Sequence, residues 1–229
     1  MYGYYYGFDP LYLYLVLPAI LLSLIASMRV KTTFSKYSGI PAALSGADAA
    51  RKVLESNGVT GVRIERVSGN LTDHFDPKTN VIRLSESVYD SYSISAVGVA
   101  AHEAGHAVQH AVGYTPIKIR SAIFPVSSLG SRLSLPLLLI GLLFNFTFLM
   151  NLGVIFFGAA LIFQLVTLPV EFNASARALG AIRSNALLDE KQISGAKKVL
   201  TAAAMTYITS FLVSLTQFLR LLALTNRRR

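Results

Sequence analysis

Two histidines and one glutamate stand at a spacing that suits metal chemistry. His102 and His106 are four residues apart, and Glu103 directly follows the first of them, so the sequence reads H-E-x-x-H. On an α-helix, residues four apart rise about 6 Å and share one face, so both imidazoles can reach a single metal ion. We therefore predict that these two histidines are ligands of Zn²⁺.

Glu103 lies beside the predicted ligands and suits the role of a general base. Zinc lowers the pKa of a bound water to about 7, and a neighbouring carboxylate can then take its proton to make a nucleophile that attacks a peptide carbonyl. We predict hydrolysis of peptide bonds by zinc-activated water, with Glu103 as the base. The alternative interpretation is a buried helix that carries histidines by chance, although the chain has only four histidines in all.

The residues around the motif favour a helix over 95–113, because alanine recurs there and Gly113 can end the helix. Gly98 and Gly105 lower the intrinsic helix propensity. Their presence inside the segment indicates close packing against another element at these two positions.

A catalytic zinc usually takes three protein ligands, and the third must come from elsewhere in the chain. His110 continues the histidine series, but on a continuous helix it lies about 12 Å from His102 in rise, so we expect it to have an orienting or structural role. Glu171, at the end of an apolar run, is the preferred third ligand. The other candidates are three aspartates, Asp73, Asp76 and Asp90.

Small side chains give Glu171 a way to approach the histidines. They recur at helical spacing after Glu171 and within the H-E-x-x-H segment, which would let two helices pack closely. The members of these two faces are Ala174, Ala178 and Ala181 in the first segment and Ala101, Ala104 and Gly105 in the second.

The composition indicates a membrane protein. Of the 229 residues, 53% are hydrophobic and only 14% are charged. The net charge of +9 does not indicate a nucleic-acid partner, because lysine and arginine lie mostly outside the apolar runs, as membrane topology requires. The chain has no cysteine, so a metal site must use histidine and carboxylate ligands.

The apolar runs divide the chain into five parts, and we predict a mainly α membrane protein whose transmembrane helices carry a small α+β zincin-like domain. The first run is about long enough to span the bilayer and lacks a signal-peptide cleavage site, so we favour an uncleaved anchor. Arg220 leaves open whether the last run crosses the membrane. The parts are an N-terminal transmembrane anchor (1–28), a metallopeptidase domain with H-E-x-x-H (29–132), a transmembrane hairpin turning near Asn151 (133–170), a third-ligand helix with a polar segment (171–200) and a C-terminal apolar helix (201–229).

Within residues 29–132, the patterns predict an amphipathic helix over 45–57, a half-buried strand over 62–67 and a β-hairpin that turns at 76–80. An edge strand beside the metal helix could pair with an extended peptide substrate. We assign this role to the segment 70–84, and we name Asn70, Leu71, Thr72 and Asp73 at its start as substrate-binding residues. Turn and cap roles are the alternative for the polar residues there. His74 and Arg177 are the candidate donors to the oxyanion.

These residues together resemble a family of peptidases. H-E-x-x-H, two apolar runs and E-x-x-A are similar to the HtpX-like and CaaX prenyl protease-like gluzincins, and the segments TDHFDPKTNVIRLSE, VAAHEAGHAVQH and LPVEFNASARAL are similar to the bacterial YugP-like neutral zinc metallopeptidases. The resemblance implies zinc at His102, His106 and Glu171, with Glu103 as general base. Where the HtpX-like pattern has an aspartate four residues after the glutamate, this chain has Ser175. We therefore expect another acid to orient a zinc histidine.

Lysine and arginine cluster between the first and second apolar runs, so we expect a bacterial plasma-membrane protein with its active site facing the cytoplasm. The arginines at 227–229 oppose this orientation if the last run crosses the membrane. The expected partners are the lipid bilayer and protein or peptide substrates, membrane proteins among them. The alternatives are a non-catalytic zinc-binding membrane scaffold, which normally needs four ligands, and a transporter, which normally places charges in mid-membrane.

Overall fold

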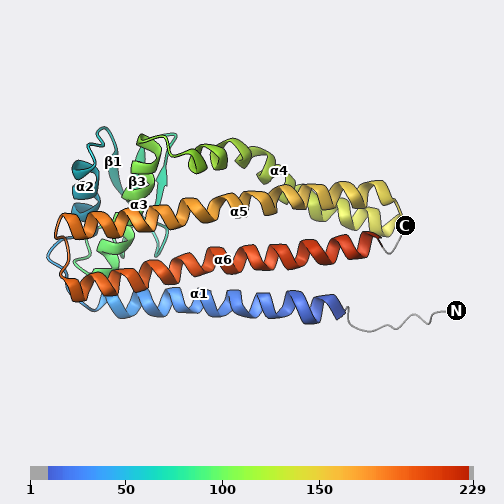
Figure 1. Cartoon of the computed structure of the whole chain (residues 1–229), viewed down its shortest axis with the longest axis horizontal. Helices are drawn as coiled ribbons and strands as arrows, with labels where there is room; N and C mark the ends of the chain where they lie inside the picture. The colour runs from blue at the N-terminus through green and yellow to red at the C-terminus, as the bar shows by residue number, and fades with distance from the viewer. Residues whose placement is uncertain (1–9, 227–229) are drawn as a thin grey trace. The chain divides into compact units, whose positions relative to one another are not determined.

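The structure, a computed structural model, describes residues 10–226 and is mainly helical (Figure 1). Its elements are a π-helical turn η1 (Tyr12–Val16), α1 (Leu17–Ser38), α2 (Gly46–Ser56), β1 (Arg63–Val67), β2 (His74–Asp76), β3 (Val81–Ser85), α3 (Ile94–Ala111), α4 (Thr115–Leu143), α5 (Thr147–Ser184) and α6 (Glu190–Asn226). The predicted fold class, a mainly α membrane protein with a small α+β part, is confirmed.

Within the described residues, four helical segments are long and apolar enough to cross a membrane: Tyr12–Ser38, Thr115–Leu143, Thr147–Ser184 and Glu190–Asn226. The last apolar run is therefore continuous with the polar segment before it and forms one long helix. Each of the four helices extends beyond the apolar run that predicted it, because polar residues continue the helical hydrogen bonding outside the apolar window. The sequence also predicts an interfacial aromatic belt that includes Tyr4, Tyr5 and Tyr6. These three residues lie outside the described residues.

The predicted turn of the transmembrane hairpin at Asn151 is wrong. Helix α4 ends at Leu143 and α5 begins at Thr147, so Asn151 lies inside α5. The turn contains Asn145 instead, with a backbone φ of 50°. Asparagine tolerates this left-handed conformation better than most residues, and the N–H of Phe146 donates to the carbonyl of Gly141 at 2.8 Å to close the end of α4.

Contacts divide the chain into two compact units, and four helices pass from one to the other. One unit comprises Met1–Ala26, Arg120–Val166 and Thr206–Arg229, and we call it the transmembrane unit. The other comprises Ser27–Ile119 and Thr167–Met205, and we call it the mixed unit. The mixed unit contains the sheet, α2, α3 and the parts of the long helices that position the predicted site residues.

The three strands of the mixed unit form one sheet in the order β1-β3-β2. Strands β2 and β3 are the antiparallel hairpin that the sequence predicts, and Phe75 pairs with Ile82. Strand β1 pairs with β3 in parallel. Because β3 occupies the centre, its side chains are almost fully buried, whereas β2 lies at the edge of the sheet.

Helices α2 and α3 form the apolar core of the mixed unit with the sheet and with residues from α5 and α6. Helix α2 begins at the predicted position, where the hydroxyl of Ser45 accepts a hydrogen bond from the Asp48 N–H at 3.1 Å. Most core positions on α3 are small. Ala96, Ala100, Ala101 and Ala104 are fully buried, so neighbouring helices can approach the α3 backbone closely.

Candidate metal centre

Helix α3 carries the H-E-x-x-H motif in its second half. The hydroxyl of Ser93 accepts a hydrogen bond from the Ala96 N–H at the start of the helix, and Gly113, with a φ of 66°, follows its end. The helix is continuous through the motif, so His102 and His106 project from successive turns of the same face. Their ring centroids are 4.7 Å apart.

A close helix contact brings α5 to this face of α3. Gly105 packs directly on the α5 backbone, where an added Cβ atom would lie 2.7 Å from the carbonyl oxygen of Ala174. Ala174 and Ala178 are completely buried. The close approach of these two small-residue faces is as the sequence predicts, and it determines how near a side chain of α5 can come to the histidines.

Glu171, three residues before Ala174 on α5, reaches both histidines. Its Oε2 atom lies 3.3 Å from Nε2 of His102 and 3.4 Å from Nε2 of His106. One potential ligand atom from each of the three residues lies within 4.8 Å of the others. Glu171 is only 2% exposed, and its Oε2 has no hydrogen-bond partner within the described structure.

A buried carboxylate oxygen without a hydrogen bond is costly, and a cation between it and two imidazole nitrogens would remove that cost. Two histidines and one glutamate are a donor set that suits zinc. The residues therefore fit the metal that the sequence predicts.

The electrostatic environment also favours positive charge at this point. Burial acts to lower the pKa of His106, but the close contact with Glu171 and the negative charge of Glu103 outweigh burial and raise the pKa. Glu103 itself is 8% exposed. The carboxylates of Glu103 and Glu171 thus both favour a positive charge at this buried position.

The far side of each imidazole contacts a neutral polar side chain. The hydroxyl of Ser175 lies 3.1 Å from Nδ1 of His102, and Oε1 of Gln109 lies 3.1 Å from Nδ1 of His106. Our expectation that another acid orients a histidine is wrong, because Ser175 itself occupies that place for His102. The sequence analysis missed Gln109, although its position three residues after His106 on the same helix face is a usable signal.

The aspartates that we considered as alternatives to Glu171 have other partners, in the hairpin and its surroundings. Asp73 accepts hydrogen bonds from the backbone N–H and the hydroxyl of Ser85, at 2.7 and 3.0 Å. Burial nevertheless raises the pKa of the Asp73 carboxyl. Asp90 forms an ion pair with Arg66 at 3.1 Å.

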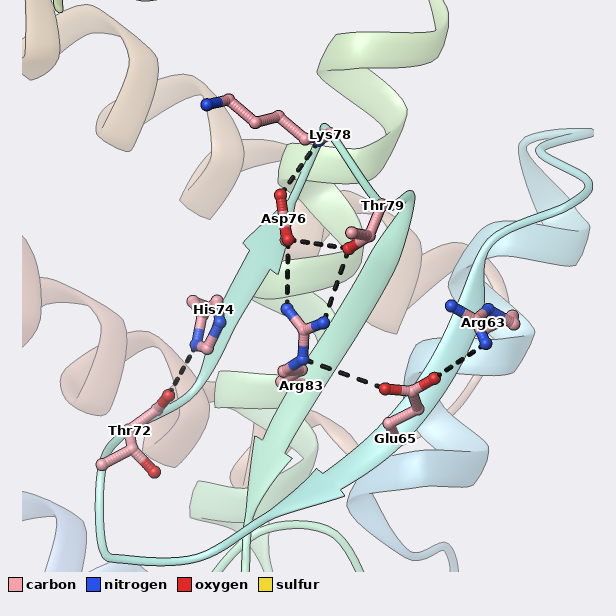
Figure 2. A network of polar contacts seen from close by, with 8 residues as sticks. All are labelled: Arg63, Glu65, Thr72, His74, Asp76, Lys78, Thr79 and Arg83. Carbon is pink, nitrogen blue, oxygen red and sulfur yellow. Dashed lines mark hydrogen bonds and ion pairs between the residues drawn. The ribbon is translucent and has the colours of Figure 1, made fainter.

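Asp76 belongs to the hairpin turn, as Figure 2 shows. Its carboxylate accepts hydrogen bonds from the hydroxyl of Thr79 at 2.7 Å, the N–H of Lys78 at 2.9 Å and the guanidinium of Arg83 at 3.2 Å. These contacts, above all that with Thr79, hold the pKa of Asp76 well below its usual range. Arg83 also approaches Glu65 on β1 at 3.8 Å. This network ties the three strands together.

The two candidate oxyanion donors, His74 and Arg177, are not part of the metal cluster. His74 is exposed, and its Nδ1 lies 2.9 Å from the carbonyl oxygen of Thr72 (Figure 2). Arg177 donates through Nε to Oδ1 of Asn173 at 2.8 Å. His110 also lies outside the cluster, and its ring packs edge-on against Phe75 at a centroid distance of 5.9 Å.

The predicted substrate-binding residues lie in the loop that leads into β2. Leu71 adopts a φ of 56° and is 38% exposed, and the hydroxyl of Thr72 donates to the carbonyl of Ser68 at 3.0 Å. The carboxylate of Asp73 is occupied by Ser85. The turn and cap roles that we kept as an alternative therefore describe the contacts of Asp73 and Asp76.

Sequence comparison agrees with the chemistry of this centre. A family model described as "putative neutral zinc metallopeptidase" matches residues 12–226. The chain belongs to this metallopeptidase family. It is also 47% identical over 212 residues to the "putative membrane protease YugP" of Bacillus subtilis (strain 168), a match that covers 92% of this chain and 94% of that protein. No solved structure matches the chain. Zinc is thus the metal that the family name implies for the cluster on α3 and α5 of this metallopeptidase-family chain.

Proposed function

We propose that this chain is a membrane-embedded zinc metalloendopeptidase in which His102, His106 and Glu171 hold the metal and Glu103 is the general base. The observation that carries the proposal is the convergence of Glu171 Oε2 on the two Nε2 atoms at 3.3 and 3.4 Å, with that oxygen buried and without a hydrogen bond. Three protein ligands leave a fourth position open, which is the arrangement of catalytic rather than structural zinc.

Zinc bound by these three residues would supply a Lewis acid that polarises a peptide carbonyl and makes a water molecule more acidic. Glu103 follows His102 directly on α3 and is nearly buried. Its carboxylate takes a proton from the attacking water and returns it to the leaving nitrogen of the cleaved peptide. Ser175 and Gln109 hold the far sides of the imidazoles, so the Nε2 atoms keep their direction toward Glu171.

For substrate binding, we favour the outer edge of β2. This strand lies at the edge of the sheet and packs against α3, and an extended peptide can pair with its free main-chain groups. Asn70, Leu71 and Thr72 form the entry to that edge, while Asp73 contributes by fixing the loop to Ser85. We propose protein or peptide substrates, including membrane proteins, and the lipid bilayer as the partners of this chain.

The experiment that tests the hydrolase proposal is a comparison of Glu103→Gln with the unmodified chain, both full-length and in detergent. We expect Glu103→Gln to retain zinc, because it removes no metal ligand, and to lose at least about 100-fold in cleavage of casein or of membrane-protein substrates. Zinc content is measured alongside cleavage. Glu55→Gln, on the exposed side of α2, is the matched control and should cleave normally.

Two results would contradict the proposal. If Glu103→Gln cleaves as fast as the unmodified chain, Glu103 is not the base. If the unmodified chain binds zinc but cleaves nothing, the non-catalytic scaffold becomes the better account. Removal of zinc by a chelator should abolish cleavage, and added zinc should restore it.

We also propose that the metal centre faces the cytoplasm of the bacterial cell. The support is the cluster of basic residues between the first and second apolar runs of the sequence, Arg29, Lys31, Lys36, Lys118, Arg120 and Arg132. Because the chain has no cysteine, single cysteines can report its orientation. In intact cells, an impermeant thiol reagent should label Phe144→Cys, which follows the far end of α4, but not Lys78→Cys in the hairpin turn. The reverse pattern would overturn this orientation.

A further inference from the structure

A buried amide connects the metal-binding helix to α5. Gln109 is completely buried, and its side chain makes three polar contacts. One carboxamide end faces Nδ1 of His106 at 3.1 Å. The other end faces two oxygens of α5, the backbone carbonyl of Val170 at 2.7 Å and Oδ1 of Asn173 at 3.0 Å.

Hydrogen-bond chemistry determines which end is which. The carbonyl oxygen of Val170 can only accept, so the end of Gln109 that contacts it must be the NH₂ group. Arg177 can only donate, and its Nε–H contacts Asn173 at 2.8 Å, so the Asn173 atom there must be the oxygen. That oxygen again needs a donor from Gln109. Two independent contacts thus orient the Gln109 amide in the same way.

The orientation of Gln109 in turn determines the tautomer of His106. The oxygen of Gln109 faces Nδ1 of His106 and can only accept, so Nδ1 of the neutral imidazole carries the proton. Nε2 is then unprotonated, and its lone pair points toward Glu171 Oε2, 3.4 Å away. Only this tautomer can bind a metal through Nε2.

We propose that Gln109, oriented by Asn173 and Arg177, is the positioning residue that holds His106 in its metal-binding tautomer. This inference rests on the proposed zinc site. The partner of a metal-bound histidine is often a carboxylate, which accepts from the imidazole without a fixed direction. A neutral amide does the same only while its NH₂ end is held, and Val170, Asn173 and Arg177 hold it.

We call the series of contacts from Arg177 through Asn173 and Gln109 to His106 the relay. Two substitutions that make the same chemical change distinguish the relay from simple attraction between charges. Gln109→Glu and Asn173→Asp each replace an amide by a carboxylate in the same network. If added negative charge near the cation is what matters, both variants bind zinc more tightly. The relay predicts that the two variants differ. Asn173→Asp keeps the acceptor at residue 173, whereas Gln109→Glu loses the donor and places a carboxylate oxygen against the oxygens of Val170 and Asn173, which repel the side chain from its place beside His106.

The experiment measures the zinc dissociation constant of the full-length chain in detergent by competition with a chelator. We expect Gln109→Glu and Gln109→Met to bind zinc about 10- to 100-fold more weakly, and Asn173→Asp to stay within about threefold of the unmodified chain. Asn173→Leu, which removes the acceptor at a half-buried position, should bind about 3- to 10-fold more weakly. Thermal melting of the metal-free variants checks that each is folded.

A second readout is the ¹⁵N spectrum of the four histidines in the metal-free chain. At a pH where His106 is neutral, it should show the Nδ1–H tautomer in the unmodified chain and in Asn173→Asp, and a tautomer mixture in Gln109→Met. The relay is overturned if all variants show the same tautomer, or if both Gln109 variants bind zinc within threefold of the unmodified chain. Either result leaves the proposed function intact. An unmodified chain that binds no zinc would overturn the proposed function itself.

Discussion

The contact of Gly105 with α5 makes a quantitative prediction. A Cβ atom at residue 105 would lie 2.7 Å from the carbonyl oxygen of Ala174, whereas ordinary contacts begin near 3.4 Å. Gly105→Ala must therefore move α3 and α5 apart by about 0.7 Å, the difference between these two distances. The obstacle is backbone, so no side chain can rotate away to relieve it.

The magnitude follows from two opposing effects. Overpacking of a close contact costs about 1–3 kcal/mol, and alanine in place of glycine in a helix contributes about 1 kcal/mol of propensity. Gly180→Ala isolates the second effect, because an added Cβ at residue 180 of α5 has nothing within 4 Å. The difference between the two variants is then the steric cost alone, about 1–3 kcal/mol.

Thermal melting of the two full-length, metal-free variants in detergent measures this difference. We expect Gly105→Ala to melt roughly 2 to 12 °C below Gly180→Ala, since about 1 kcal/mol shifts the midpoint by 2–4 °C at this chain length. Gly98→Ala is an intermediate case, because its nearest contact, the Cβ of Ala196, lies at 3.5 Å and should be tolerated. Zinc binding should weaken in Gly105→Ala as Glu171 moves away from the histidines.

Equal melting temperatures for Gly105→Ala and Gly180→Ala would refute this reasoning. That result would mean that α3 and α5 are not in contact at Gly105, and the approach of Glu171 to the histidines would lose its explanation. A lower melting temperature without weaker zinc binding would separate the packing of the helices from the position of the carboxylate.

Three further predictions concern single contacts. The hydrogen bonds of Asp76, first that with Thr79, lower its pKa. Its contribution to stability is therefore present above the ordinary carboxyl pKa and is lost as the pH falls toward the depressed value. In acid denaturation, Asp76→Asn should lose less stability over this pH range than the unmodified chain does. Burial raises the pKa of Asp73, so the dependence of stability on pH has the opposite sign for this residue. The stability that protonated Asp73 contributes is lost as the pH rises through the raised pKa. Melting of Asp73→Asn at a series of pH values should lack this dependence. Ser175→Ala removes the hydroxyl beside His102 and should weaken zinc affinity by about 10-fold in chelator competition, whereas an unchanged affinity would deny Ser175 an orienting role.

The local features of the site could be predicted from the sequence because they depend on short-range periodicity. Four-residue spacing on a helix places His102 and His106 on one face whatever the rest of the fold does. Alternation and turn residues predict the hairpin of β2 and β3 for the same reason. The apolar runs predict the four long helices, because spanning a bilayer requires a minimum length of apolar residues.

The features that the sequence left open or predicted wrongly depend on contacts between distant segments. Asn145 and Asn151 are equally plausible turn residues by type, and the choice between them depends on where the packing of α4 and α5 ends each helix. The parallel pairing of β1 with β3 likewise has no local signal.

The orientation of the metal ligands is the clearest case of tertiary control. The amide of Gln109 can point either way in an isolated helix, and only the carbonyl of Val170 and the side chain of Asn173 on α5 determine its direction. The sequence alone determined which residues could bind a metal, since that depends on residue type and helix period. The tertiary structure decided which nitrogen of His106 faces Glu171, because hydrogen-bond direction is set by partners 61 and 64 residues away in the chain.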